Sequence, residues 1–77
     1  MDNAETTISA GAVQLAVLWV GSVTTLADLV GVSRKTVYRW LEGEAEISPE
    51  NAQQLERSTG IPKQFFRADL WRVPTHV

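Results

Sequence analysis

The sequence predicts a small all-helical (all-α) domain, and two observations support this prediction. Apolar residues recur at helical spacing in several short segments, so each segment has one face that can be buried. Glycines that can end a helix and serines that can begin one separate these segments. The 77 residues leave room for a single domain. We expect five compactly packed helices within residues 10–73, with residues 1–9 and 74–77 as flexible ends.

Two of the predicted helices, residues 23–30 and 34–41, meet across a three-residue break. Gly31 follows the first helix, where glycine adopts the left-handed conformation without strain. Ser33 precedes the second, where its hydroxyl can accept a backbone N–H of the first turn. This is the layout of a helix-turn-helix. The residues expected to fill the angle between the two helices are Leu26, Ala27, Val30, Val32, Val37 and Trp40.

The opposite side of the second helix is basic. At about 100° per residue, Lys35 and Arg39 lie nearly opposite Val37, and Ser33, Arg34 and Tyr38 flank them. These are the places from which a recognition helix reaches base edges in the major groove of DNA. The alternative is an ordinary helical hairpin with a solvated basic face, which the agreement of so many positions disfavours.

The chain is acidic overall, but for nucleic-acid binding the distribution of charge matters more than the net charge. The chain carries a net charge of −2, yet Arg34, Lys35 and Arg39 stand in a stretch, residues 29–41, that contains no acid. A concentrated basic face can bind phosphate on an otherwise acidic molecule, at the cost of weaker non-specific binding.

Other classes of protein are disfavoured by what the sequence lacks. It has no cysteine, and the single histidine, His76, cannot form a metal site alone. No nucleophile–base pair and no glycine-rich phosphate loop is present, so we expect no enzyme and no cofactor. The apolar run 10–20 is too short to span a bilayer and follows acidic rather than basic residues. A cytoplasmic protein without membrane contact is expected.

The first predicted helix, residues 10–20 with Ser9 as its N-cap, is apolar on almost every side. Leu15, Leu18 and Trp19 can face the core. A second apolar side then remains, formed by Val13, Val17 and Val20. Such a helix is either buried beneath the others or contacts another subunit or partner.

The end of the chain is predicted to hold two helices. Ser48, Pro49 and Glu50 start the first, which ends at about Thr59 before Gly60. The second runs from Pro62 to about Ala68, with a β-hairpin as the second choice. An apolar cluster follows that either packs inward or forms a dimer or partner contact: Phe65, Phe66, Leu70 and Trp71.

The segments GSVTTLADLVGVSRKTVYRW and EISPENAQQLERSTGIPKQFFRADLW resemble the small Cro-type repressors of lambdoid phages and the related YdaS-like proteins of bacterial prophages. The resemblance covers about residues 15–71. It implies a five-helix, lambda-repressor-like domain that binds a palindromic operator, usually as a homodimer, and represses transcription by occupying a promoter.

Carried over residue by residue, the resemblance places the base-reading positions on Ser33, Arg34, Lys35, Tyr38 and Arg39. Contacts to the DNA backbone fall on Thr24, Thr25 and Thr36, near helix ends that can present N–H groups to phosphate. The alternative function is a YdaS-like antitoxin, a protein-binding regulator that neutralises a partner protein.

Overall fold

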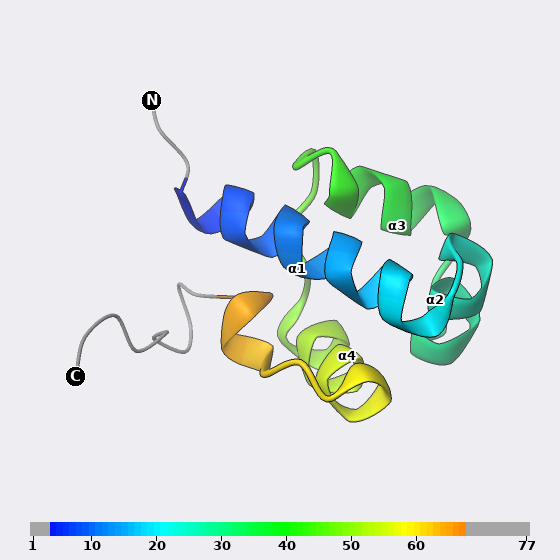
Figure 1. The fold of residues 1–77 in the computed structure, drawn as a ribbon. Coiled ribbons are helices and arrows are strands. Elements are labelled where there is room, and N and C mark those ends of the chain that lie inside the picture. Colours follow the sequence, from blue (N-terminus) through cyan, green and yellow to red (C-terminus); the bar gives the residue numbers. More distant parts are fainter. Residues whose placement is uncertain (1–3, 68–77) are drawn as a thin grey trace.

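The computed structural model describes residues 4–67, and within them the chain is entirely helical (Figure 1). Four α-helices are followed by one 3-10 turn, and none of the described residues forms a strand. The elements are α1 Ala4–Val20, α2 Val23–Val30, α3 Arg34–Leu41, α4 Pro49–Thr59 and η1 Lys63–Phe65.

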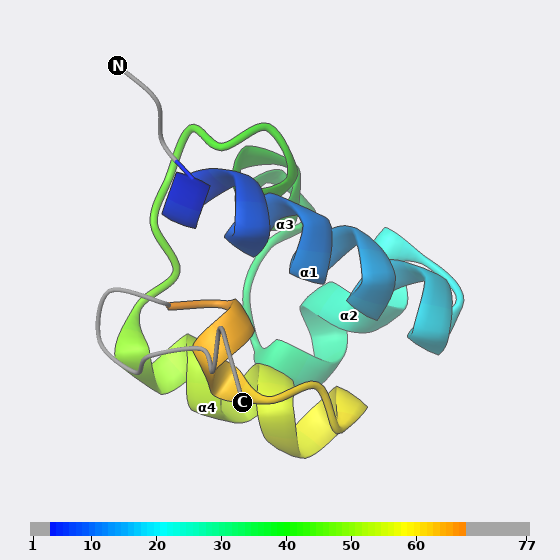
Figure 2. The ribbon, with the colours of Figure 1, turned by 60° about the vertical axis from the view of Figure 1, so that its left-hand side comes forward.

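The long helix α1 is the centre of the arrangement, because it contacts each of the other four elements. Helix α3 lies on one side of α1, and α4 with η1 lies on the other (Figures 1 and 2). Helix α2 closes the end of the domain by contacting both α3 and α4. One buried cluster joins the four α-helices to Ile47, between α3 and α4, and to Phe66, directly after η1. Its members are Ala12, Val13, Ala16, Leu26, Ala27, Val37, Trp40, Ile47, Ala52, Leu55 and Phe66.

Helices α2, α3 and α4 begin in the same way. In each, a serine in extended conformation accepts the backbone N–H of the residue three positions later. The N···O distances lie between 3.0 and 3.1 Å for the pairs Ser22–Thr25, Ser33–Thr36 and Ser48–Asn51. These hydrogen bonds satisfy N–H groups that have no partner within the helix. The predicted bounds of these three helices are confirmed.

Helix α1 begins earlier than predicted. It is already formed at Ala4, so the prediction of Ser9 as its N-cap is wrong. The Ser9 hydroxyl instead donates a hydrogen bond to the carbonyl oxygen of Phe66, at 2.7 Å. Serine is common at helix caps because its hydroxyl can form a hydrogen bond with a nearby backbone group. In Ser9 the hydroxyl bonds instead to a backbone carbonyl that is distant in the sequence.

The predicted orientation of α1 is also wrong. Val13 and Ala16 are fully buried, whereas Leu15, Leu18 and Trp19 are 55%, 72% and 74% exposed. Alanine at positions 12 and 16 allows the other helices to approach α1 closely, which favours this side for the core. The larger apolar residues therefore lie on the outside.

The predicted fifth helix is a single 3-10 turn. The N–H groups of Phe66 and Arg67 both bond to the Lys63 carbonyl, at 2.9 and 3.1 Å. The Phe66 carbonyl accepts a hydrogen bond from the Ser9 hydroxyl of α1. Phe66 is 1% exposed and belongs to the core, while Phe65 is 36% exposed. Leu70 and Trp71, which complete the predicted apolar cluster, lie outside the described residues.

Within residues 4–67, no helix is by itself both long enough and apolar enough to cross a bilayer. Residues 8–20 and 23–30 would meet the criteria of length and composition only as a pair, and they are bent by 102° relative to each other.

Trp40 tests this description of the core. It is 3% exposed, whereas Tyr38 on the same helix is 51% exposed. We expect Trp40→Ala to lower the free energy of unfolding by about 3–5 kcal/mol, a large part of what a domain of this size possesses. Tyr38→Ala, the control, should change it by less than about 1 kcal/mol. Urea unfolding followed by circular dichroism measures both changes. Equal losses of unfolding free energy would contradict the burial of Trp40 in the core.

Candidate nucleic-acid interface

The turn between α2 and α3 sets the direction of α3. Gly31 has φ 85° and ψ 32°, and its N–H bonds to the Ala27 carbonyl at 2.8 Å. The N–H of Val32 bonds to the same carbonyl at 3.0 Å. Ser33 then caps α3. The chain therefore leaves α2 and enters α3 within three residues, and hydrogen bonds hold the N–H groups of the first two.

The inner face of α3 is held by apolar contacts. Val37 is fully buried and Trp40 nearly so, and both belong to the cluster shared with α1 and α2. Because these two residues face inward, helical geometry turns the positions between them toward solvent. The axial rotation of α3, and with it the outward display of its polar residues, is fixed by this burial.

The outer face of α3 carries the predicted base-reading residues. Ser33, Arg34, Lys35, Tyr38 and Arg39 are all exposed. Among residues 4–67, no acidic side chain forms an ion pair with Arg34, Lys35 or Arg39. An α-helix with its side chains is about 10–12 Å across, so it fits into the DNA major groove, which is about 12 Å wide. This face can present three cationic side chains to a nucleic acid.

The three threonines that are predicted to contact the DNA backbone differ in their exposure and in their hydrogen bonds. Thr24 and Thr25 on α2 are exposed, and Thr36 on α3 is half-buried. Thr25 Oγ1 accepts a hydrogen bond from Ser22 at 2.9 Å, and Thr36 Oγ1 lies 3.0 Å from Ser33 Oγ. Ser33 and Thr36 thus support the start of α3 as well as facing the predicted interface.

Acidic residues lie on α2 and directly after α3, and the one on α2 was missed by sequence reasoning. Asp28 is exposed on α2, about one turn after Thr24 and Thr25. A carboxylate there opposes the approach of phosphate to that side of α2. The same helical spacing that identified the outer face of α3 would have identified Asp28 had it been applied to α2. At the other end, Glu42 and Glu44 follow α3 and are exposed.

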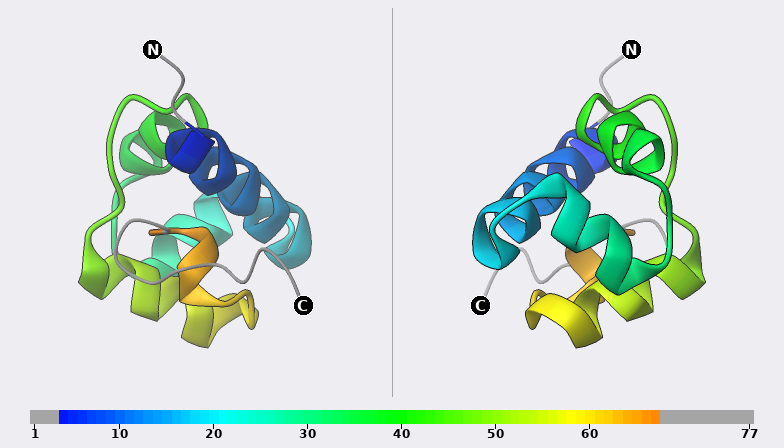
Figure 3. Two further views of the ribbon diagram at one scale, coloured as in Figure 1. Left: turned by 90° about the vertical axis from the view of Figure 1, so that its left-hand side faces the viewer. Right: turned by 90° about the vertical axis from the view of Figure 1, so that its right-hand side faces the viewer.

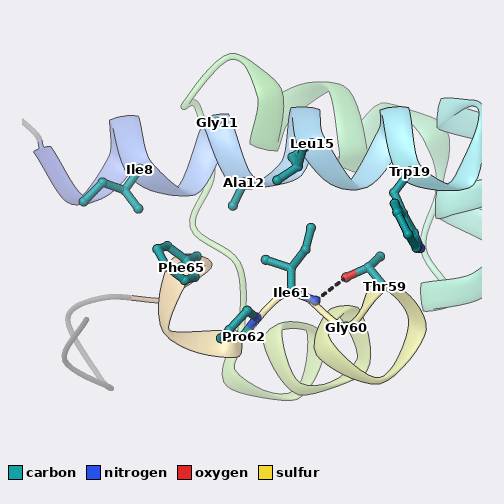
Figure 4. A pocket seen from close by; sticks show the side chains of 10 residues that line it. All are labelled: Ile8, Gly11, Ala12, Leu15, Trp19, Thr59, Gly60, Ile61, Pro62 and Phe65. Atoms are coloured by element: carbon teal, nitrogen blue, oxygen red, sulfur yellow. Dashed lines mark hydrogen bonds between the residues drawn. The ribbon is translucent and has the colours of Figure 1, made fainter. Parts of the chain in front are cut away.

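A second surface feature is an apolar groove on a different side of the domain. It encloses about 600 Å³ between α1, the end of α4 and η1 (Figure 4). In Figure 3, α3 lies near the top of the domain, whereas α4 and η1, which form the groove together with α1, lie at the bottom. None of the lining residues is charged or belongs to α3. They are Ile8, Gly11, Ala12, Leu15, Trp19, Thr59, Gly60, Ile61, Pro62 and Phe65.

A family model described as bacterial toxin YdaS matches residues 13–74, which include the C-terminal half of α1 and all of α2, α3, α4 and η1. Neither the curated proteins nor the solved structures that were compared match the chain.

The turn can be tested with one substitution made at two glycines. A Cβ atom added to Gly31 or to Gly11 would have no other atom within 4 Å, so only the backbone decides the effect. Gly31→Ala should destabilise the domain by about 1–2 kcal/mol, because alanine is strained in the left-handed conformation. Gly11→Ala, inside α1, should stabilise it by up to about 1 kcal/mol. Thermal unfolding at low protein concentration measures both, and shifts of the same sign would contradict the predicted backbone roles.

Proposed function

The chain belongs to the bacterial toxin YdaS family, a prophage-type family, and we propose that it acts as a sequence-specific DNA-binding repressor of the Cro type. In this proposal α2 and α3 form a helix-turn-helix within a lambda-repressor-like domain, and α3 is the recognition helix. Repression follows from occupying a promoter, so the proposal requires no catalytic step and no cofactor. The protein would act in the cytoplasm, where the DNA is.

The observation that supports this proposal most directly is the two-sided character of α3. Its inner side is buried through Val37 and Trp40, and its outer side presents Arg34, Lys35 and Arg39 to solvent. A helix that only completes the core needs no cations on its outer face. Rigid display of cationic side chains along two helical turns is what reading of base edges in the major groove requires.

The proposed contacts fall into two classes. Arginine and lysine side chains on α3 can pair with the O6 and N7 acceptors of guanine, while Ser33 and Tyr38 contact neighbouring positions. Thr24, Thr25 and Thr36 lie on α2 and α3 close to helix N-termini, where hydroxyl and backbone N–H groups can bind phosphate. Base contacts give sequence preference, and phosphate contacts fix the position of α3 in the groove.

We further propose that the protein binds as a homodimer to an inverted repeat. One recognition helix reads only a few base pairs, which is too few to select one site in a genome. A two-fold pair places two such helices about 34 Å apart on one side of the duplex. Within the predicted contact cluster, Phe66 has no exposed surface to offer and Phe65 is available.

A second candidate is a protein-binding regulator of the toxin–antitoxin kind, such as an antitoxin that neutralises a partner. The uncharged groove beside α1 favours it, because an open apolar surface is typical of a protein-binding site. The two functions are compatible, since the groove and the outer face of α3 share no residue.

Salt dependence separates the two candidates. Binding of a DNA duplex releases counterions, so the logarithm of the binding constant should fall linearly with the logarithm of salt concentration. The slope should be about −0.9 for each phosphate neutralised. Fluorescence anisotropy with labelled duplex at several salt concentrations measures it. A protein whose only ligand is another protein would show almost no binding to the duplex at any salt concentration.

Alanine variants test the assignment of α3. If Arg34, Lys35 or Arg39 pairs with guanine, its replacement should cost about 1–3 kcal/mol on the selected site and relax the preference at one base pair. The matched control is Arg57→Ala, which removes an exposed arginine from α4. Arg57→Ala should leave base preference unchanged. If all three α3 variants lose equal binding free energy on selected and on random DNA, these side chains contact only phosphate.

A further inference from the structure

The apolar groove lies between α1 and residues 59–65, and among the described residues its walls are open to solvent. Trp19, at one end of the groove, is 74% exposed, and Leu15 is 55% exposed. Ile8 and Phe65, at the other end, are 39% and 36% exposed (Figure 4). Exposed apolar surface of this extent is typical of a contact site.

The described part of the chain stops beside this groove. The Ser9 hydroxyl donates a hydrogen bond to the Phe66 carbonyl at 2.7 Å, and Ser9 directly follows Ile8 on α1. This bond holds Phe66 at the Ile8 end of the groove. Residues 68–77 follow in the sequence, so the rest of the chain starts from this end.

The composition of the following segment suits the groove. Leu70, Trp71, Val73 and Pro74 are apolar, and Arg72 is the charged residue among them. Proline disfavours the helical conformation in the residue that precedes it, so Val73 favours an extended backbone. In an extended chain alternate side chains point to opposite sides. Trp71 and Val73 can therefore face an apolar surface while Arg72 faces solvent.

We propose that residues 70–74 dock in the groove of their own chain, with Trp71 and Val73 pointing into it. Residues 67–69 reverse the direction of the chain, and the docked segment then runs from the Ile8 end to the Trp19 end. Five extended residues span about 16 Å. Ile8 and Trp19 are separated by about 16 Å along α1, so the segment fills the groove from end to end.

The lengths also give a register. Counted from Ile8, Trp71 lies about 3 Å along the groove and Gly11 about 4 Å. The space beside Gly11 is open, because a Cβ atom built on this glycine meets nothing within 4 Å. A large ring from the docked segment fits there. Val73 lies about 10 Å along the groove, opposite Leu15, which is also about 10 Å from Ile8.

The covalent tether selects this occupant over a second copy or a separate partner. Three residues join the anchored Phe66 to Leu70, and a segment on so short a linker is present at an effective concentration of millimolar order. A separate molecule of equal affinity competes only when it reaches that concentration. The family model also matches as far as residue 74, so the docking segment belongs to the matched domain.

Docking regulates access to the groove. A partner protein that uses the groove, as in the second candidate function, must first displace residues 70–74. Its apparent affinity is reduced in proportion to the fraction of chains whose groove is open.

The inference does not depend on the proposed DNA binding. None of the residues that line the groove belongs to α3. Docking is measured on the chain alone, without DNA, and DNA binding is measured on the α3 variants. Failure of one result therefore leaves the other in place.

Disulfide formation tests the register, since the chain contains no cysteine of its own. Leu15→Cys is combined with Val73→Cys, and the matched control combines Gln14→Cys with Val73→Cys. Gln14 precedes Leu15 on α1 and is exposed, but it does not line the groove, and its side chain points about 100° away. A disulfide needs Cα atoms within about 7 Å and Cβ atoms that face each other. A docked segment meets this condition at position 15, whereas an undocked one reaches both positions.

At low micromolar concentration, we expect the intrachain disulfide between positions 15 and 73 to form at least tenfold faster than the one between 14 and 73. Adding Trp71→Ala to the first pair should slow it at least tenfold, because the ring beside Gly11 is lost. Thr75→Ala lies beyond the docking segment and should leave the rate unchanged. Equal rates for the two pairs, or disulfides that form only between chains, would overturn the proposal.

Fluorescence quenching gives a second measurement that leaves the groove residues intact. In Trp71→Phe the remaining tryptophans are Trp19 in the groove and Trp40, which is 3% exposed. Adding Val73→Asp places a charge in the groove and should undock the segment, so acrylamide should quench Trp19 at least twofold more strongly. Thr75→Asp is the control and should leave quenching unchanged.

Trp40 separates undocking from unfolding. When Trp19→Phe is added to these proteins, Trp40 alone emits, and its quenching should stay low with and without Val73→Asp. If Trp19 is quenched equally with and without Val73→Asp, the segment does not cover it and the proposal fails.

Discussion

The contact between α1 and α3 is the interaction on which the rest of the structure depends. Val13 and Ala16 of α1 and Val37 and Trp40 of α3 lie in the same buried cluster. Small residues on α1 allow α3 to lie close, and the tryptophan fills the remaining space. This burial determines which side of α3 faces solvent. The position of the basic side chains therefore follows from apolar packing rather than from electrostatics, since none of them forms an ion pair within residues 4–67.

The central and later parts of the fold could be predicted from the sequence because their signals are local. A serine three residues before a bonded N–H group begins α2, α3 and α4, and Gly31 and Gly60 end α2 and α4 with positive φ. These are steric and hydrogen-bonding rules that act over one turn of chain. The inward side of α3 was equally predictable, because its apolar residues fall on one face of the helix and its polar residues on the other.

The orientation of α1 and the form of η1 could not be predicted, because the interactions that decide them are not local. Helix α1 is apolar on two sides, so periodicity does not tell which side meets the core. The answer depends on size, since Ala12 and Ala16 permit closer packing than Leu15 and Leu18, and on long-range bonds. Ser9 with Phe66 and Arg67 with Ile47 join residues that are 57 and 20 positions apart. Local sequence patterns do not predict such bonds.

The chain belongs to the bacterial toxin YdaS family, and the central proposal is that α3 reads DNA sequence. An acidic protein with a small basic face should bind random DNA weakly and depend on base contacts for affinity. In vitro selection from a random duplex pool tests this claim most directly. The account predicts enrichment of a short inverted repeat with guanines at fixed positions in each half-site. A selected pool that remains random in sequence would contradict it.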